Sequence, residues 1–159
     1  RSGGKIGQAD GLYTQEKGLG LVIQTADCLP VFLIGANSIA AVHAGWRGVA
    51  NQIIEEACQI VQPTVAIIGP SISGECYEVG EEVVDAIVAT GVAEEFFVDR
   101  SKTKAHVNCR YAAQHQLLAL GVEKIEVSSE CTFQDSNWAS YRRDGADAGR
   151  ILSVIGYRI

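Results

Sequence analysis

The 159-residue sequence contains no methionine, three prolines, two tryptophans and only three histidines. No apolar run approaches the roughly 20 residues that a membrane-spanning helix needs. Its 13 basic residues are outnumbered by 19 acidic ones, which gives a net charge of −6. Nucleic acids and anionic membrane surfaces require a basic face. We therefore expect neither of them as the main partner.

The cysteine and histidine counts exclude two further classes of protein. Five cysteines is an odd number, and their irregular spacing is not that of a short disulfide-rich scaffold. We expect reduced thiols and a cytoplasmic location. A multicopper oxidase centre needs about ten imidazole ligands for four coppers. Because the chain has three histidines, we do not expect a copper centre.

Apolar β-rich runs alternate with amphipathic helical patterns along the chain. The length suits one domain, residues 1–159, with one core. Residues 131–150 look mostly like loop, with a short strand at 138–141. The pattern predicts an α/β fold with a mixed sheet. The predicted strands are 20–25, 29–35, 38–44, 64–69, 124–129 and 151–159, and the predicted helices are 49–61, 80–91 and 108–121, the last with Asn108 as N-cap and Gly121 just beyond its C-terminus.

A hairpin is predicted within TADCLPVFLIGANSIAAVHAGWRG, residues 25–48. A turn centred on Ala36 and Asn37 places Pro30 opposite His43. Cys28 shares the face of Pro30, because side chains alternate along a strand. Cys28 and His43 are then diagonal neighbours, about 7–8 Å apart at the backbone. At that separation they can share a metal ion or a hydrogen bond, and we expect sulfur and imidazole nitrogen within roughly 4 Å.

Structural explanations compete with the functional ones for each of these residues. A single cysteine is most often a small buried hydrophobe, and a single histidine is most often a hydrogen-bonded polar group. Asp27 is unusual at a strand end unless it caps or orients something. Arg47 follows Gly45 at a predicted helix start, where N–H groups and a guanidinium can bind an anion. The simpler interpretation of Arg47 is a surface ion pair.

Several motifs together resemble the laccase-domain family, also called the polyphenol oxidase, purine nucleoside phosphorylase or peptidoglycan editing factor family. The pairing of TADCLPV with HAGWRG is highly specific, and the resemblance extends over essentially the whole chain. The motifs are QADGLYT at 8–14, TADCLPV at 25–31, AVHAGWRG at 41–48, GPSISGECYEVG at 69–80, ECT at 130–132 and SYRRDG at 140–145.

The resemblance implies a layered α/β sandwich similar to cysteine-hydrolase domains. It also implies one zinc held by two histidines and one cysteine, with Cys28 and His43 as two of the ligands. The remaining histidine is expected upstream of Arg1, because an N-terminal segment of the family pattern is absent. Cys76 is interpreted as a packing cysteine beside a turn. We expect the zinc site to be incomplete in this chain.

The implied activities are phosphorolysis of adenosine, inosine and methylthioadenosine, and deamination of adenosine, with nucleoside and phosphate as small-molecule substrates. Arg47 is the first candidate phosphate ligand and Arg143 the second, although Arg142 and Arg143 also fit a solvated charge pair. Two alternatives remain. One is a metal-free hydrolase of a peptidoglycan precursor, with Cys28 as nucleophile and His43 as base. The other is a truncated, non-catalytic binding protein.

Overall fold

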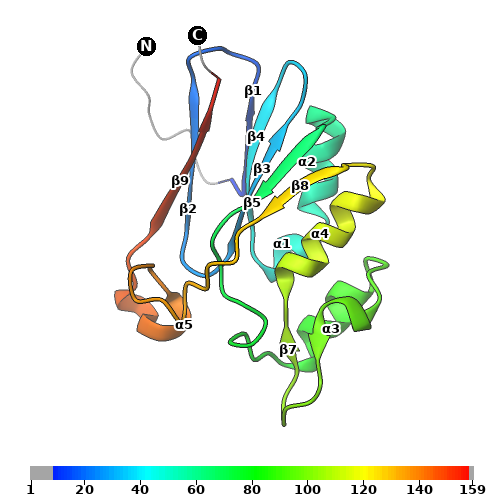
Figure 1. The fold of residues 1–159 in the computed structure, drawn as a ribbon, viewed down its shortest axis with the longest axis vertical. Helices are drawn as coiled ribbons and strands as arrows, with labels where there is room; N and C mark the ends of the chain where they lie inside the picture. The colour runs from blue at the N-terminus through cyan, green and yellow to red at the C-terminus, as the bar shows by residue number, and fades with distance from the viewer. Residues whose placement is uncertain (1–8, 158–159) are drawn as a thin grey trace.

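A five-stranded mixed sheet forms the centre of the computed structural model, which describes residues 9–157. The strand order is β1-β4-β3-β5-β8 (Figure 1). The pairs β1–β4, β4–β3 and β3–β5 are antiparallel, whereas β5 and β8 are parallel. The α/β class and the mixed sheet are thus confirmed. The strands are β1 (Gly11–Thr14), β3 (Leu29–Ile34), β4 (Ile39–Ala44), β5 (Val65–Ile68) and β8 (Lys124–Val127).

The β3–β4 hairpin has the register that the sequence predicts. Pro30 pairs with His43, and the turn closes through a 2.9 Å hydrogen bond from the Gly35 N–H to the Ser38 carbonyl. Gly35 also lets helix α2 (Ile53–Val61) approach the hairpin closely. A Cβ atom at this position would lie 2.3 Å from the carbonyl oxygen of Val61.

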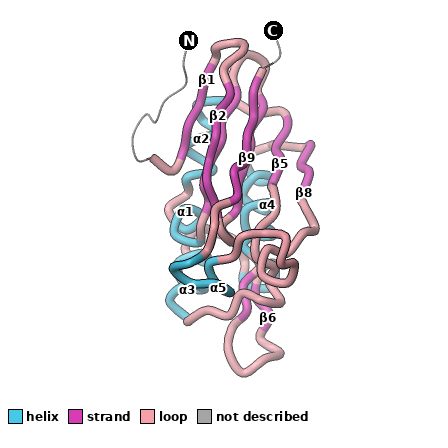
Figure 2. The backbone as a smooth tube through the Cα atoms, turned by 90° about the vertical axis from the view of Figure 1, so that its left-hand side faces the viewer, coloured by secondary structure: helices cyan, strands magenta, loops and turns pink. Residues whose placement is uncertain are grey.

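The two faces of the sheet are covered differently, which produces three layers. Helices α1 (Trp46–Ala50), α2 (Ile53–Val61) and α4 (Cys109–Ala119) cover one face. A two-stranded antiparallel ribbon of β2 (Gly20–Thr25) and β9 (Ile151–Gly156) covers the other. Figure 2 views the molecule from the side of this ribbon. A small cluster fills the space between ribbon and sheet, and it consists of Leu21, Ile23, Phe32, Ile39 and Ala41.

The predicted helix at 49–61 is wrong in its bounds, because the structure has two helices there. Helix α1 begins at Trp46 and ends at Ala50, and α2 begins at Ile53. Gln52 between them is left-handed, with φ of 58°, which a continuous right-handed helix cannot contain. The apolar period continues across the break, so periodicity alone did not reveal it.

Helix α4 has the caps that the sequence predicts. The Asn108 side chain accepts hydrogen bonds from the backbone N–H groups of Arg110 at 3.1 Å and Tyr111 at 3.4 Å. Gly121 is left-handed at the other end, with φ of 83°. The segment before α4 contains α3 (Glu81–Val88), the 3-10 helix Glu94–Phe96, and the short strands β6 (Val98–Asp99) and β7 (His106–Val107).

The strand predicted at 138–141 is wrong. A short helix, α5 (Tyr141–Asp144), occupies this region and is followed by a 3-10 turn at Gly145–Asp147. Ser140 caps α5 by accepting a 3.2 Å hydrogen bond from the Arg143 N–H. Strand β1 was not predicted. The end of the predicted last strand, residues 158–159, lies outside the described residues. No described helix is both long and apolar enough to cross a membrane.

Candidate functional site

The candidate site lies at the end of the sheet where β3 begins and β4 ends. Cys28 immediately precedes β3, and His43 is the penultimate residue of β4. The Asp10 carboxylate connects them, because it contacts the His43 ring and its charge also acts on the Cys28 thiol. The structure therefore brings both predicted residues to one region. The predicted 4 Å separation of sulfur and nitrogen stays a prediction.

Asp10 holds His43 at two points. The His43 backbone N–H donates to the Asp10 carbonyl at 2.7 Å, and the His43 Nδ1 lies 3.1 Å from Asp10 Oδ1. An ionised carboxylate only accepts hydrogen bonds, so this contact requires the proton on Nδ1. In the neutral imidazole, the Nε2 atom then keeps its lone pair for a metal ion or a substrate proton.

The surroundings of Cys28 disfavour its thiolate. Burial raises the pKa of the thiol above its ordinary value of 9.0, and the charges of Asp27 and Asp10 raise it further. Gly45 packs against the sulfur, since a Cβ atom there would lie 3.1 Å from Sγ. A nearby cation would reverse the electrostatic balance, because a positive charge favours the thiolate. The residues thus fit a thiolate ligand of a metal ion better than a free nucleophile.

Asp27 fixes the backbone that presents Cys28. Its buried carboxylate accepts a 2.7 Å hydrogen bond from the Thr132 hydroxyl and a 2.6 Å bond from the backbone N–H of Arg142, at the start of α5. Its carbonyl accepts from the N–H of Ile72 at 3.0 Å. Its φ is 82°, in the left-handed region. The sequence-based expectation that Asp27 caps or orients something is confirmed.

The charges of two arginines and of Cys28 act on Tyr77. Arg47 is exposed, and its guanidinium stacks 4.2 Å from the Trp46 ring centroid. No ion pair of Arg47 is found within residues 9–157. The Arg142 guanidinium lies 5.0 Å from the Tyr77 ring centroid. Burial raises the pKa of Tyr77, and the charges of Cys28, Arg142 and Arg47 all act on its hydroxyl, so this phenol stays protonated near neutral pH.

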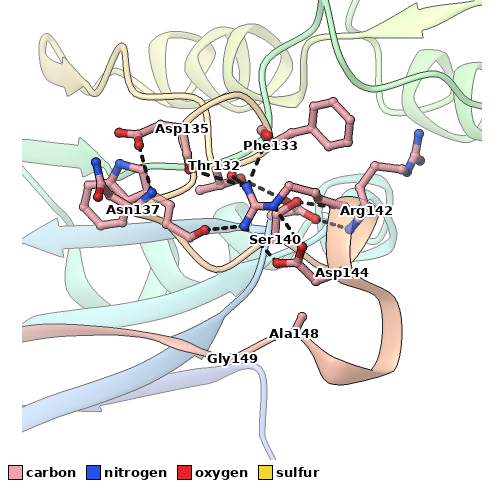
Figure 3. A network of polar contacts seen from close by, with 12 residues as sticks. Thr132, Phe133, Asp135, Asn137, Ser140, Arg142, Asp144, Ala148 and Gly149 are labelled. Carbon is pink, nitrogen blue, oxygen red and sulfur yellow. Dashed lines mark hydrogen bonds and ion pairs between the residues drawn. The ribbon is translucent and has the colours of Figure 1, made fainter.

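Arg143, in α5, is fully engaged by Asp144 and by the loop before the helix. Figure 3 shows the polar network that includes Thr132, Phe133 and Asp144. The Arg143 Nε and Nη2 donate to the Asp144 carboxylate at 2.9 and 2.8 Å. Its Nη1 donates to the carbonyls of Thr132 at 2.9 Å and Phe133 at 3.2 Å, and its Nη2 donates to that of Trp138 at 2.7 Å. All five N–H donors of the guanidinium have acceptors. This arrangement is that of a loop-stabilising residue rather than of the predicted phosphate ligand.

The remaining histidines are held elsewhere in the fold. His106 lies in β7, with Nδ1 3.0 Å from the Lys104 carbonyl. His115 lies in α4, where its ring packs 4.7 Å from that of Phe96. Within residues 9–157 no group of three or more histidine, cysteine or acidic side chains is arranged to hold a metal ion.

Comparisons with known proteins show the family to which the chain belongs. The family described as multi-copper polyphenol oxidoreductase laccase matches residues 2–158. The chain belongs to this laccase-domain family. A curated member named purine nucleoside phosphorylase, from Bacteroides thetaiotaomicron, is 38% identical over 92% of the chain. Another member, adenosine deaminase RL5 from an unknown prokaryotic organism, is 34% identical over 92% of the chain.

Solved structures of laccase-domain proteins share the fold. The crystal structure of YlmD from Geobacillus stearothermophilus gives a TM-score of 0.88 at 33% identity, covering 96% of this chain and 62% of that one. The structure of Neisseria meningitidis NMB0706 gives a TM-score of 0.87 at 31% identity, covering 95% of this chain and 65% of that one. The chain spans 60% of the length of the Bacteroides relative and 61% of RL5.

Two residues of the site, Asp10 and Tyr77, were not predicted from the sequence. Asp10 is 33 positions from His43, and only the pairing of β1 with β4 brings them together. Tyr77 lies in GECYEVG, where no periodic pattern indicates its position. The motifs QADGLYT and GPSISGECYEVG contain these two residues, but the motifs do not show what the side chains contact.

Proposed function

We propose that the full-length protein is a zinc-dependent enzyme that phosphorolyses purine nucleosides and deaminates adenosine. Laccase-domain relatives carry names for both activities, and they support an enzyme of this family. The observation that carries the proposal is the contact between Asp10 and His43 beside Cys28. It leaves one imidazole nitrogen and one thiol available at the same end of the sheet.

Zinc suits this donor set. Imidazole nitrogen and cysteine sulfur are its usual ligands, and a carboxylate behind a histidine is a frequent companion of metal-bound imidazole. Cys28 and His43 Nε2 would hold the ion together with a histidine expected upstream of Arg1. When bound, zinc acidifies a water molecule or polarises an oxygen of the substrate. We propose no copper centre, because a multicopper centre needs about ten imidazole ligands and the chain has three histidines.

The other residues of the site are assigned by their contacts. Asp10 keeps the proton on His43 Nδ1 and fixes the ring. Asp27 holds the backbone of Cys28 in place. Arg47 is exposed and its planar donors are uncommitted by any ion pair within residues 9–157, so we assign it to phosphate. Arg143 is assigned to the loop and not to the substrate.

The metal-free hydrolase alternative is less well supported. A cysteine nucleophile reacts as the thiolate, and two carboxylates near Cys28 act against that form. His43 also turns its protonated nitrogen toward Asp10, which leaves Nε2 as the one atom able to act as a base. No observation within residues 9–157 favours a cell-wall precursor over a nucleoside.

The test uses purified full-length protein with adenosine and inosine, with and without phosphate, and separates nucleoside, inosine and free base. Cys28→Ala and His43→Ala should each lower both activities at least 100-fold. Matched controls are Cys76→Ala and His106→Ala, which lie on other loops and strands and should retain activity. Cleavage of a peptidoglycan precursor without phosphate, and no change of either nucleoside, would support the hydrolase instead. No turnover with a complete zinc site would support the binding protein.

A further inference from the structure

Two cysteines outside the candidate site lie on neighbouring loops. The parallel pairing of β5 with β8 continues into an isolated bridge between Ser71 and Cys131. Cys76 sits five residues after Ser71 in a turn, in which its N–H donates to the Ser73 carbonyl at 3.1 Å. Ser73 contacts both cysteines, because its N–H donates to the Cys131 sulfur and its carbonyl accepts from the Cys76 N–H. The Cys131 thiol is also one of the groups that shift the pKa of Cys76. Neither thiol has a role in the proposed chemistry.

The sulfur of Cys131 is surrounded by hydrogen-bond donors. The backbone N–H of Ser73 donates to Sγ at 3.3 Å, and the backbone N–H groups of Gln134 and Phe133 act on the pKa of the same thiol. Burial acts to raise the pKa of this thiol, but the hydrogen bonds from Ser73, Gln134 and Phe133 outweigh it and lower the pKa. Convergent N–H groups of this kind stabilise an anion. Cys131 is therefore the reactive thiol of the pair, because the thiolate is the nucleophile.

Cys76 has the opposite character. It is half-buried, whereas Cys131 is buried, and burial raises its pKa. It therefore remains a thiol beside the Cys131 sulfur. An anionic cysteine next to a protonated, more accessible one is the arrangement in which a first oxidised sulfur is resolved by a second.

We propose that Cys76 and Cys131 form a redox-active dithiol, a modification site for hydrogen peroxide or a similar small peroxide. The Cys131 thiolate attacks one peroxide oxygen, the O–O bond breaks, and the departing hydroxide takes up a proton to form water. Cys76 then attacks the sulfenic sulfur as its own proton leaves with the displaced hydroxide. Two electrons pass from the two sulfurs to peroxide, and the products are one disulfide and two waters.

The disulfide would constrain the loop that orients the candidate site. Cys131 is followed by Thr132, whose hydroxyl donates to Asp27, and Asp27 precedes Cys28. The two loops are also joined by Arg110, whose guanidinium donates to the Ser71 hydroxyl at 2.7 Å and to the Ser128 carbonyl at 3.0 Å. A disulfide between Cys76 and Cys131 would therefore join two loops that Arg110 already connects.

Peptide mapping tests the proposal directly. The purified protein is treated with stoichiometric hydrogen peroxide, alkylated, and cut with trypsin and a glutamate-specific protease. Cleavage after Glu75, Glu78 and Glu130 separates Cys76 from Cys58 and places Cys131 in the peptide 131–142. We expect a disulfide-linked pair of peptides 76–78 and 131–142, the loss of two of the five free thiols, and full reversal by dithiothreitol.

Three cysteine-to-serine variants test the role assigned to each sulfur. Cys76→Ser should leave Cys131 as a sulfenic acid that dimedone traps, whereas Cys131→Ser should leave Cys76 unoxidised. Cys58→Ser is the matched control, since burial raises the pKa of Cys58 to about 11, and the linked peptide should form unchanged. Five intact thiols after peroxide treatment, or a disulfide that joins Cys76 to a different cysteine, would overturn the proposal.

Discussion

At the scale of single residues, the site depends on carboxylates that act on other side chains rather than on a substrate. Asp10 determines which nitrogen of His43 carries the proton. The two carboxylate oxygens of Asp27 accept hydrogen bonds from the Thr132 hydroxyl and the Arg142 backbone N–H, both far along the chain. Asp10 and Asp27 each also raise the pKa of Cys28. The Cys28 thiol is consequently disfavoured as a thiolate, and a nearby cation would act in the opposite direction.

The raised pKa of Cys28 predicts the pH dependence of its alkylation in metal-free protein. The thiolate reacts, so the rate should rise with pH around a midpoint above 9.0. Asp10→Asn removes a negative charge that raises the pKa, so it should move the midpoint down. The rate is measured by mass spectrometry of the peptide 18–47, in which Cys28 is the one cysteine. Asp135→Asn is the control. A midpoint below 9.0 in the unmodified chain would contradict this prediction.

Arg47→Ala separates the two proposed reactions. Phosphorolysis should require at least 10-fold more phosphate, because the variant loses a charged donor for the anion. Deamination should stay nearly intact, because water rather than phosphate is its nucleophile. Initial rates for inosine across a phosphate series, and for adenosine without phosphate, measure the two effects. Arg100→Ala, whose guanidinium is paired with Glu81 and Glu94, is the control. Equal loss of both activities would show that Arg47 is not a specific phosphate ligand.

At the scale of elements, local patterns predicted the hairpin and the capped helix well. The two-residue turn and the alternation of side chains determine the β3–β4 register, and Asn108 and Gly121 mark the ends of α4. Long-range contacts determined the rest. Helix α5 depends on Asp27, which lies 115 positions from Arg142. Asp10 reaches His43 through a strand pairing. The sequence indicates that Asp27 caps or orients something, but it does not identify the distant partners of Asp27 or Asp10.

Asp27→Ala should destabilise the fold by about 2–3 kcal/mol, since it removes the acceptor of the Arg142 N–H at the start of α5 and the partner of the Thr132 hydroxyl. Asp27→Asn should cost less, because asparagine tolerates the left-handed backbone and keeps one carbonyl acceptor. Urea unfolding followed by circular dichroism measures the free energy of unfolding. If Asp27→Ala lowers the free energy of unfolding no more than Asp135→Ala does, the hydrogen bonds of Asp27 contribute little to stability.

Gly35→Ala tests the packing of the hairpin against α2. The added methyl would lie 2.3 Å from the Val61 carbonyl oxygen, and overpacking of this kind costs about 1–3 kcal/mol. Gly11→Ala in β1 is the matched control, because no atom lies within 4 Å of a Cβ at that position. Thermal unfolding should show a lower Tm for Gly35→Ala only. Equal Tm values for the two variants would mean that the close approach is easily relaxed.

At the scale of the whole molecule, the three layers bring four distant parts of the chain to one end of the sheet. Asp10 comes from the entry to β1, Cys28 and His43 from the hairpin, Tyr77 from the loop after β5, and α5 from the segment before β9. The family resemblance in the sequence identified the cysteine and the histidine, because their motifs are local. It did not show what holds them, because those contacts exist only in the folded chain.

Zinc X-ray absorption spectroscopy of the full-length protein, combined with elemental analysis, tests whether Cys28 and His43 bind the same metal ion. We expect one zinc per chain, with one sulfur ligand at about 2.3 Å and nitrogen ligands at about 2.0–2.1 Å. The sulfur shell should vanish in Cys28→Ser and remain in Cys76→Ser, and one nitrogen ligand should be lost in His43→Ala. Zinc without a sulfur ligand, or a sulfur shell unchanged by Cys28→Ser, would show that Cys28 and His43 do not share a zinc ion.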